Sequence, residues 1–264
     1  MRTAQALGGS GLEAREARLL LAAAAGFSEV SVLAFPEREL PAETAARFAS
    51  FAERRRRGEP VAYILGEKEF YGLRLALNAA VLIPRPETEL LVDLAIEKNP
   101  AKVLDLGTGC GALALAIKKH CPLASVSAVE RSEAALVVAR RNAVKLNLDL
   151  EFLHGEWFAP VAGRRFDCIV ANPPYIAESD PHLPELRYEP RSALVAGRDG
   201  LDALREIASA ASAHLNPGGR VLVEHGAGQG AAVRRMFREA KLENVETWPD
   251  LAGIARVTGG RLES

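Results

Sequence analysis

Cysteine and histidine are scarce in this sequence, which holds three and five of them in 264 residues. The cysteines are Cys110, Cys121 and Cys168, an odd number with no C-x-x-C pair among them. A disulfide framework or a zinc site needs paired cysteines or cysteines and histidines at ligand spacing, and the histidines here are scattered. The sequence therefore indicates neither, and we expect no bound metal.

An excess of charge and a long apolar run are also lacking. Lys and Arg number 33 against 34 Asp and Glu, which gives a net charge of -1 and a pI of about 6.6. Phosphate neutralisation supplies most of the affinity of nucleic-acid binders, so this balance argues against a direct nucleic-acid substrate. No apolar run is long enough to span a bilayer, and the first residues do not resemble a signal peptide. We expect a soluble, cytoplasmic protein.

The chain does contain enough apolar residues, 48%, for a sizeable core, and its length suits a catalytic domain with a small accessory domain. Residues 1–58 show helical spacing of apolar side chains, with breaks expected at Pro36 and Pro41. The run Arg54–Arg57 ends the last of these helices, and a solvated helix end is favoured there over a docking patch. From Val61 to Ile83 the pattern changes to one typical of a β-hairpin or short strands. We interpret residues 59–85 as a connector between domains.

Residues 86–264 alternate between strand and helix patterns. Strands are predicted at 102–106, 125–130, 150–153, 166–171 and 220–225, and helices at 87–98, 111–120, 132–147, 200–214 and 229–240. Strands 102–106, 166–171 and 220–225 are continuously apolar, as in parallel sheets buried on both faces. The alternation predicts an α/β, Rossmann-like doubly wound sheet with a ligand crevice at the carboxyl ends of its strands.

A glycine-rich loop, Asp105–Gly111, lies directly after the first of these strands and directly before a helix. Glycines let the backbone turn tightly and approach a ligand, and a helix start offers free N–H groups. The second strand ends in Glu130, whose carboxylate can accept hydrogen bonds from ribose hydroxyls. NAD would suit both features. The spacing G-x-G-x-G, instead of G-x-G-x-x-G, and the acidic Asp105 before the loop favour S-adenosylmethionine.

An indole, Trp157, follows the third strand at the same edge of the sheet. Its flat face could pack against an adenine ring, while a lone tryptophan in a sequence is as often a core residue. The sequence leaves these two interpretations of Trp157 open.

The sequence Asn172-Pro173-Pro174-Tyr175 follows strand 166–171 and carries the chemistry. Prolines cannot continue a central strand, and they hold the residue before them extended, so a stiff loop is expected. A planar amide or amino nitrogen is a poor nucleophile with two N–H donors. The Asn172 side-chain oxygen and the Pro173 carbonyl could accept both hydrogen bonds and orient the nitrogen, with Tyr175 stacked on the planar group. The loop predicts methylation of such a nitrogen, because an ordinary proline-rich turn rarely follows a D-x-G-x-G-x-G loop in this register.

With these motifs, the chain resembles the release-factor glutamine N5-methyltransferases from about residue 55 to its end. Further segments carry the resemblance, in the expected order: Pro60–Gly66, Phe70–Gly72, Ile83–Glu89, Asn172–Ile176, Tyr188–Pro190, Ala193–Leu194 and Glu224–Gly226. The N-terminal helices resemble the substrate-docking domain of that family only in length and helicity. Glu130 and Glu156 stand where the family commonly has Asp, and the longer side chain of Glu130 changes the geometry expected at the ribose.

The resemblance implies S-adenosylmethionine as the methyl donor and the glutamine of the Gly-Gly-Gln loop in class I peptide-chain release factors as the acceptor. It implies catalysis by Asn172, Pro173 and Tyr175, and substrate binding by these residues and Pro174. It implies donor binding by Gly107, Thr108, Gly109, Cys110, Gly111, Glu130, Trp157 and Asn172. It also implies that residues 1–58 dock the release factor and that 86–264 form the methyltransferase domain. We expect a monomer.

Three alternatives stay open at this point. N-P-P-Y would serve an adenine-N6 methyltransferase equally well, although the net charge and the lack of a base-recognition insert argue against it. A related enzyme could methylate a glutamine of a ribosomal protein, although the segment Ile83–Thr88 favours release factors. A donor-binding adaptor without activity is disfavoured by the intact Asn172 and Tyr175.

Overall fold

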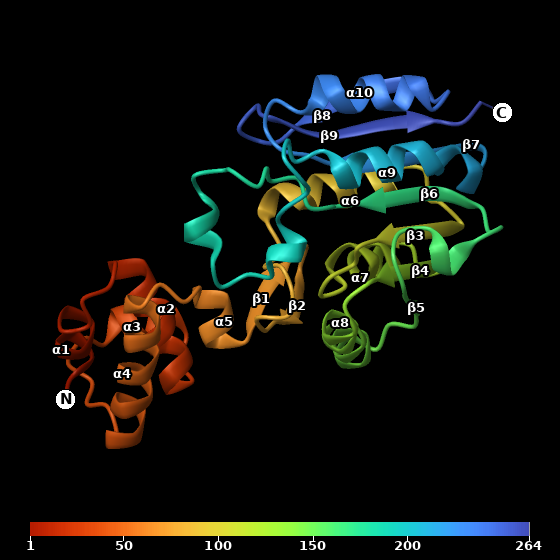
Figure 1. Cartoon of the computed structure of the whole chain (residues 1–264). Coiled ribbons are helices and arrows are strands. Elements are labelled where there is room, and N and C mark those ends of the chain that lie inside the picture. The colour runs from red at the N-terminus through yellow and green to blue at the C-terminus, as the bar shows by residue number, and fades with distance from the viewer. Residues whose placement is uncertain (264) are drawn as a thin grey trace. The chain divides into compact units, whose positions relative to one another are not determined.

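The computed structural model describes residues 1–263 and divides into two compact units, Met1–Glu67 and a second unit that begins at Lys68. Figure 1 shows helices in the first unit and a central sheet with helices in the second. None of the helices in residues 1–263 is long and apolar enough to cross a membrane. The same residues hold no group of three metal-ligating side chains.

The first unit is helical, as the sequence predicts. It contains α1 (Thr3–Gly8), α2 (Ala14–Ala25), α3 (Glu29–Ala34), α4 (Ala42–Arg56) and α5 (Val61–Leu65). The Glu13 carboxylate caps the start of α2 by accepting from the N–H groups of Arg15 and Glu16, and Gly26 ends that helix with a φ of +69°. Buried side chains from these helices and from the segment between α3 and α4 form one small core: Ala6, Leu20, Leu21, Ala22, Ala24, Val32, Leu40, Phe48 and Ile64.

The four arginines that end α4 are paired with carboxylates of their own unit. Arg54 pairs with Glu59, Arg55 with Glu16, and both Arg56 and Arg57 with Glu53. These contacts satisfy the charges of the run, and its position at the negative end of α4 is favourable.

The β-hairpin expected between Val61 and Ile83 is shorter than its apolar pattern suggests. Residues 61–65 form α5, which starts after Pro60 and ends at Gly66, whose φ is +74°. The strand prediction for these residues is wrong, because a proline before the first turn and a left-handed glycine after the last one favour a short helix. The hairpin itself consists of β1 (Glu67–Phe70) and β2 (Leu73–Ala76).

The second unit is built on a seven-stranded sheet with the order β5-β4-β3-β6-β7-β9-β8. Its strands are β3 (Lys102–Leu106), β4 (Ser125–Glu130), β5 (Glu151–His154), β6 (Phe166–Ala171), β7 (Leu215–Glu224), β8 (Glu243–Pro249) and β9 (Ala255–Arg261). The first five are parallel, and β9 and β8 are antiparallel. Between β3 and β6 the strand order reverses direction, which is where doubly wound sheets bind their ligands.

Helices cover both faces of this sheet, as the continuous apolar strands predict. Leu104 and Leu106 of β3 belong to a core with side chains of α9 (Asp202–Ala211) and α10 (Gly230–Glu239). Residues alternate between the faces of a strand, so Asp105 points to the opposite face. There its carboxylate accepts from the N–H of Ala114 in α7 (Ala112–His120). Two further helices complete the unit, α6 (Glu89–Ile96) and α8 (Glu133–Leu146).

The predicted strands and helices between residues 87 and 240 are confirmed to within a few residues, except that β7 begins five residues earlier than predicted. The hairpin of β8 and β9 was not predicted. Glu243–Pro249 has mostly exposed side chains and β9 contains Gly259 and Gly260, so neither strand shows an apolar pattern. Only the pairing of β9 with β7 makes them strands.

Candidate functional site

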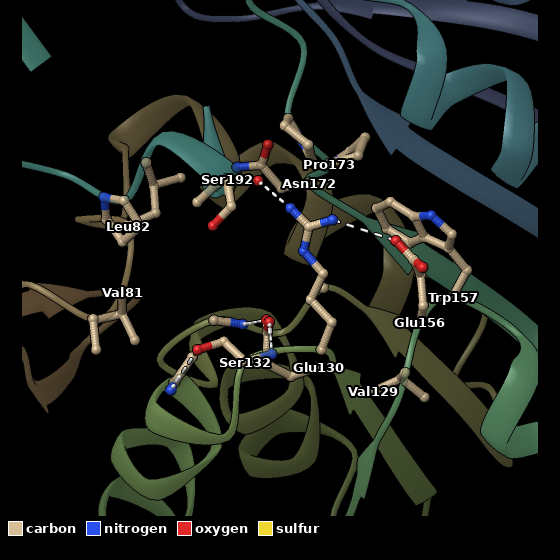
Figure 2. A pocket seen from close by; sticks show the side chains of 18 of the residues that line it. Val81, Leu82, Val129, Glu130, Ser132, Glu156, Trp157, Asn172, Pro173 and Ser192 are labelled. Atoms are coloured by element: carbon tan, nitrogen blue, oxygen red, sulfur yellow. Dashed lines mark hydrogen bonds and ion pairs between the residues drawn. The ribbon is translucent and has the colours of Figure 1, made fainter. Parts of the chain in front are cut away.

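A pocket opens at the carboxyl ends of β3, β4, β5 and β6, where the sequence motifs predict a site (Figure 2). The motif residues that line it come from all four strand ends: Gly107, Gly109, Glu130, Trp157, Asn172, Pro173 and Pro174. Figure 2 shows Asn172 and Pro173 opposite Glu130 and Ser132. The sheet thus brings together residues that lie up to 67 positions apart in the chain.

The glycine-rich loop turns sharply between β3 and α7. Gly107, Gly109 and Gly111 have φ values of +71°, +57° and +88°, a region that L side chains rarely adopt. A Cβ on Gly111 would also lie 2.9 Å from Cδ1 of Leu115. The loop therefore requires glycine at Gly111 on two grounds, and the N-terminal turn of α7 follows directly after it.

Three other residues of the loop hold its shape instead of lining the pocket. The Thr108 hydroxyl donates to Oδ2 of Asp105 at 2.6 Å, and the Cys110 carbonyl accepts from Nδ2 of Asn142 at 2.9 Å. The Cys110 thiol is buried, and burial raises its pKa to about 12. The side chains of Thr108 and Cys110 and the backbone of Gly111 are therefore structural parts of the loop.

Asp105 is completely buried below the loop. Burial raises its pKa to about 7, partly offset by hydrogen bonds from the Thr108 hydroxyl and the Ala114 N–H. Its Oδ1 atom is buried and accepts no hydrogen bond. An unpaired buried oxygen of this kind costs about 1–3 kcal/mol.

This buried carboxyl should make the stability of the protein depend on pH. The folded-state pKa lies above the ordinary 3.8, so the unfolding free energy should fall as the pH rises from about 4 to 7. Asp105→Asn cannot ionise, so its stability relative to the wild type should increase by about 2–4 kcal/mol over that interval. Thermal unfolding of both proteins at pH 5 and pH 8 measures the difference. An equal difference at both pH values would show that Asp105 does not titrate there.

Glu130 lies at the end of β4, with both carboxylate oxygens bound to backbone N–H groups. Oε2 accepts from the Gly109 N–H and Oε1 from the Ser132 N–H, each at 2.9 Å. These bonds fix the carboxylate beside the glycine loop, in the pocket lining. Each oxygen retains a lone pair for a ligand hydroxyl.

Trp157 follows β5, and its position agrees with both interpretations that the sequence leaves open, a core residue and a residue of the ligand pocket. Its side chain packs against the main core of the second unit and also lines the pocket. Its φ is +44°, unusual for a residue with a side chain. Just before it, a Cβ on Gly155 would lie 2.3 Å from Cγ of Pro160, so the tight turn that places Trp157 requires glycine.

Asn172 follows β6 and is oriented by a residue of another segment. Its Nδ2 donates to the Thr88 hydroxyl oxygen at 3.1 Å. Its Oδ1 is buried and has no hydrogen-bond partner. The amide therefore presents an unsatisfied acceptor, which a ligand N–H group could pair.

A second cavity adjoins the first and shares Leu82, Asn172, Pro173 and Ala193 with it. Tyr175 lines this second cavity only, so it lies on the far side of Asn172 from the glycine loop. The Tyr175 hydroxyl donates to Oε1 of Glu224 at 3.2 Å, and burial beside that carboxyl raises its pKa well above 10. Asn172 and Pro173 thus stand between two compartments.

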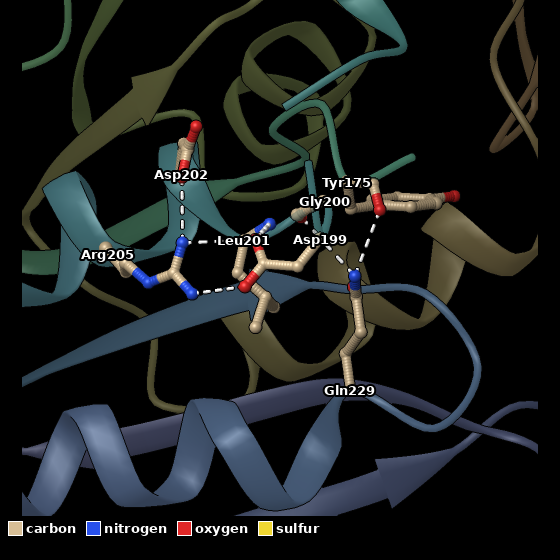
Figure 3. Close-up of polar contacts among 7 residues, drawn as sticks. All are labelled: Tyr175, Asp199, Gly200, Leu201, Asp202, Arg205 and Gln229. Carbon is tan, nitrogen blue, oxygen red and sulfur yellow. Dashed lines mark hydrogen bonds and ion pairs between the residues drawn. The ribbon is translucent and has the colours of Figure 1, made fainter. Parts of the chain in front are cut away.

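The backbone of the same loop is fixed at Tyr175 by Gln229, which precedes α10 (Figure 3). Its Nε2 donates to the carbonyl oxygens of Tyr175 at 3.0 Å and Gly200 at 3.3 Å. Its Oε1 accepts from the Gly226 N–H at 2.8 Å. A Cβ on Gly200 would lie 2.3 Å from the Tyr175 carbonyl oxygen, so glycine is required for this close approach.

Sequence reasoning missed several residues of the pocket wall. Arg131 donates to Oε1 of Glu156 at 3.3 Å and to the carbonyl oxygen of Ser192 at 3.0 Å, and all three residues line the pocket. Ala80–Leu82, Pro190, Ser192 and Ala193 also line it. These segments carry no chemical pattern of their own, and only their positions in the fold bring them to the site.

One buried carboxylate attaches two of these wall segments to each other. Glu189, 7% exposed, accepts from the Ile83 N–H at 2.9 Å and pairs with Arg85. The segments Ile83–Glu89 and Tyr188–Pro190, both noted for their resemblance to one family, are therefore in direct contact.

Comparisons with known proteins agree with this arrangement. Residues 86–184 match the family model of the Methyltransferase small domain, and residues 2–66 that of the PrmC N-terminal domain. A methyltransferase structure from Pyrococcus furiosus superimposes with a TM-score of 0.60 at 18% identity, covering 82% of this chain and all of that one. The fold is that of a methyltransferase. The match of residues 86–184 assigns the chain to the S-adenosylmethionine-dependent methyltransferases.

Two curated relatives show to which family of methyltransferases the chain belongs. The release factor glutamine methyltransferase of Burkholderia pseudomallei is 48% identical over 98% of this chain and 95% of its own length. The enzyme of the same name from Pseudomonas aeruginosa is 49% identical over 93% and 91%. The chain belongs to the release factor glutamine methyltransferase family.

Proposed function

We propose that this enzyme transfers a methyl group from S-adenosylmethionine to the side-chain amide nitrogen of the glutamine in the Gly-Gly-Gln motif of class I peptide-chain release factors. The observation that carries the proposal is the position of Asn172. Asn172, whose Oδ1 has no hydrogen-bond partner, lines both of two adjoining cavities, one beside the glycine loop and one lined by Tyr175. A donor and an acceptor in these cavities would meet at Asn172.

The residues of the first cavity fit the donor. We assign ribose binding to Glu130, whose carboxylate is held by two N–H groups and keeps lone pairs free, and adenine contact to Trp157. The loop Gly107–Gly111 allows close backbone approach, because its three glycines have positive φ values. Bound S-adenosylmethionine supplies an electrophilic methyl group.

Asn172, Pro173, Pro174 and Tyr175 are assigned to the acceptor. Asn172 Oδ1 and the Pro173 carbonyl accept hydrogen bonds from the two N–H groups of the amide. These bonds fix the direction of the nitrogen and favour the pyramidal form, in which its lone pair is available to the methyl group. Tyr175 and the prolines enclose the planar amide. The hydrogen bonds strengthen as positive charge develops on the nitrogen, so acceleration comes from positioning and electrostatics without a strong base.

The ribose assignment can be tested with Glu130→Ala. Loss of two charge-assisted hydrogen bonds, each worth about 1.5–3 kcal/mol, should weaken donor binding tenfold or more in calorimetry. The donor affinity of Glu130→Gln, which keeps one acceptor oxygen, should lie between that of Glu130→Ala and that of the wild type. Glu151→Ala is the matched control, because that carboxylate lies outside the pocket and pairs with Arg164 and Ser127. Donor affinity equal to the wild type in Glu130→Ala would refute the assignment.

The relatives' names and the match of residues 2–66 support the release factor as the protein partner. We infer that the helical unit within residues 1–58 docks the release factor, that 59–85 connect it and that 86–264 carry the chemistry. Remote binding of this kind orients the reacting amide. We also propose that the enzyme acts as a monomer in the cytoplasm, where its substrate functions, and has no nucleic-acid substrate.

The direct experiment is incubation with labelled S-adenosylmethionine and a purified class I release factor, followed by mass mapping of the modified residue. We expect a single methyl group on the glutamine of the Gly-Gly-Gln loop. A methyl group on any other residue would overturn the substrate assignment.

A further inference from the structure

The N-P-P-Y loop has few backbone groups with which it could be held in place. Pro173 and Pro174 carry no N–H group, so neither can donate a backbone hydrogen bond. The carbonyl of Pro173 is assigned to the acceptor amide and has to stay available for it. The position of the loop therefore depends on contacts made by the residues on either side of the two prolines.

The peptide group between Tyr175 and Ile176 provides such a contact, and it is held at both ends. Its N–H group, which belongs to Ile176, donates to the Leu194 carbonyl at 2.9 Å. Its carbonyl, which belongs to Tyr175, accepts from Nε2 of Gln229 at 3.0 Å. Gln229 directly precedes α10 and lines neither of the two cavities. Figure 3 shows its side chain extending toward Tyr175.

The partners of Gln229 fix the direction of its side-chain amide. On one side Oε1 accepts from the backbone N–H of Gly226 at 2.8 Å. On the other side Nε2 donates to the carbonyl oxygens of Tyr175 and Gly200. A flipped amide would place its oxygen against two oxygens and its NH2 group against a donor. The oxygen of Gln229 therefore serves the turn before α10, while its NH2 group serves the loop.

The Tyr175 carbonyl is packed closely against the segment that carries Gly200. A Cβ on Gly200 would lie 2.3 Å from this carbonyl oxygen and 3.0 Å from Nε2 of Gln229. The segment is itself held by the ion pair between the neighbouring Asp199 and Arg205 (Figure 3). Only a residue without a side chain at this position lets the amide of Gln229 reach both carbonyls.

We propose that Gln229 is a positioning residue for methyl transfer: its Nε2 atom holds the Tyr175 carbonyl against Gly200. This contact keeps the N-P-P-Y loop where Asn172 and Pro173 can orient the acceptor amide. The inference rests on the proposed function of that loop. Gln229 acts through the backbone at Tyr175, and a misplacement of about 1 Å at a reacting group can lower a rate about 100-fold.

The first test is Gln229→Glu, which keeps the shape of the side chain and one accepting oxygen. The carboxylate can still accept from the Gly226 N–H, and its charge is favourable at the start of α10. It has no proton to donate to the Tyr175 carbonyl. We therefore expect a melting temperature close to that of the wild type and donor affinity within twofold, while kcat on the release factor falls tenfold or more. A residue needed only to start α10 would keep its kcat in this variant.

The second test is Gly200→Ala, which acts on the same carbonyl from the other side. The added Cβ should displace the Tyr175 carbonyl, and the φ of +75° adds backbone strain. Gly163→Ala is the matched control, because its φ is also +75° but its Cβ would meet nothing within 4 Å. Both variants carry the strain, so both should lose stability. Only Gly200→Ala should lose tenfold or more in kcat, and equal kcat in the two would contradict the proposal.

The contact can also be followed without the reaction. The backbone amide resonance of Ile176 reports on the peptide group whose carbonyl Gln229 holds, and it can be assigned in isoleucine-labelled enzyme by its absence in Ile176→Val. It should shift in Gln229→Glu and Gly200→Ala and stay near its wild-type position in Gly163→Ala. An unshifted Ile176 amide in Gln229→Glu, or more than half of the wild-type kcat in that variant, would overturn the proposal. If the wild-type enzyme fails to methylate a release factor, the proposed function fails, while the resonance still tests whether Gln229 holds the loop.

Discussion

Asn172→Ala should lower turnover on a release factor by a factor of about 100 or more while leaving donor affinity within a few-fold. A single preorganised hydrogen-bonding group at a reacting centre contributes about 2.7–4 kcal/mol to transition-state stabilisation. The Asn172 Oδ1 atom is such a group, because it is buried, unpaired and held by Thr88 on its other end. Single-turnover kinetics with saturating donor measures the rate, and calorimetry measures donor binding.

Asn216→Ala is the control for this variant. Asn216 is partly buried in β7 and its Nδ2 donates to Asp167 at 2.7 Å. The Asn216→Ala variant therefore loses a comparable hydrogen bond away from the pocket. Its melting temperature should fall, and its turnover should stay near that of the wild type. Half of the wild-type turnover in Asn172→Ala would remove Asn172 from the mechanism.

The second large effect concerns the substrate. With labelled donor, an intact release factor should be methylated, and its Gln→Ala variant at the Gly-Gly-Gln loop should give a signal at background. Free glutamine should also stay unlabelled, because it lacks the remote contacts that would hold its amide in reactive geometry. A glutamine between glycines can enter a narrow cavity, since glycine leaves the approach unobstructed.

Duplex DNA and ribosomal RNA belong in the same assay, because Asn172 and Pro173 would bind an adenine amino group as well as an amide. Discrimination has to come from cavity shape and remote contacts. A duplex base must be unstacked at a cost of a few kcal/mol, and the net charge of -1 offers no basic excess to compensate. Stronger label on nucleic acid than on the release factor, or equal label on the release factor and its Gln→Ala variant, would refute the substrate assignment. Neither result would refute the assignment as a methyltransferase.

Much of the second unit was predictable from residue pattern alone. Strands β3 and β6, the apolar part of β7 and the loop Asp105–Gly111 have local signals: continuous apolar runs, and glycines at positions of positive φ. Because strands and helices alternate along the chain, the strands are parallel and their carboxyl ends meet at the same edge of the sheet. The pocket lining confirms that Glu130, Trp157 and Asn172 lie at one edge of the sheet. Their individual roles stay predictions until the variants are measured.

Other features have no local signal. The helix at Val61–Leu65 depends on its flanking proline and glycine, and its alternating apolar residues misled the strand prediction. Strands β8 and β9 are polar or glycine-rich and exist because β7 offers an edge with which β9 pairs. Arg131 and Gln229 are ordinary polar residues in the sequence, and only their neighbours in space give them a place at the site.

The sequence by itself determined the class of fold, the glycine loop after β3 and the functional groups that the N-P-P-Y loop presents, because each depends on a few consecutive residues whose backbone preferences and functional groups are local properties. The tertiary structure decided how that chemistry is oriented. The side-chain amide of Asn172 ends in an oxygen and an NH2 group of nearly equal size. Nothing in N-P-P-Y determines which of the two faces the pocket. Thr88, 84 positions earlier in the chain, accepts from the Asn172 Nδ2 and leaves Oδ1 without a partner. Hydrogen-bond direction is a property of the partners, so it is set only when folding brings them together.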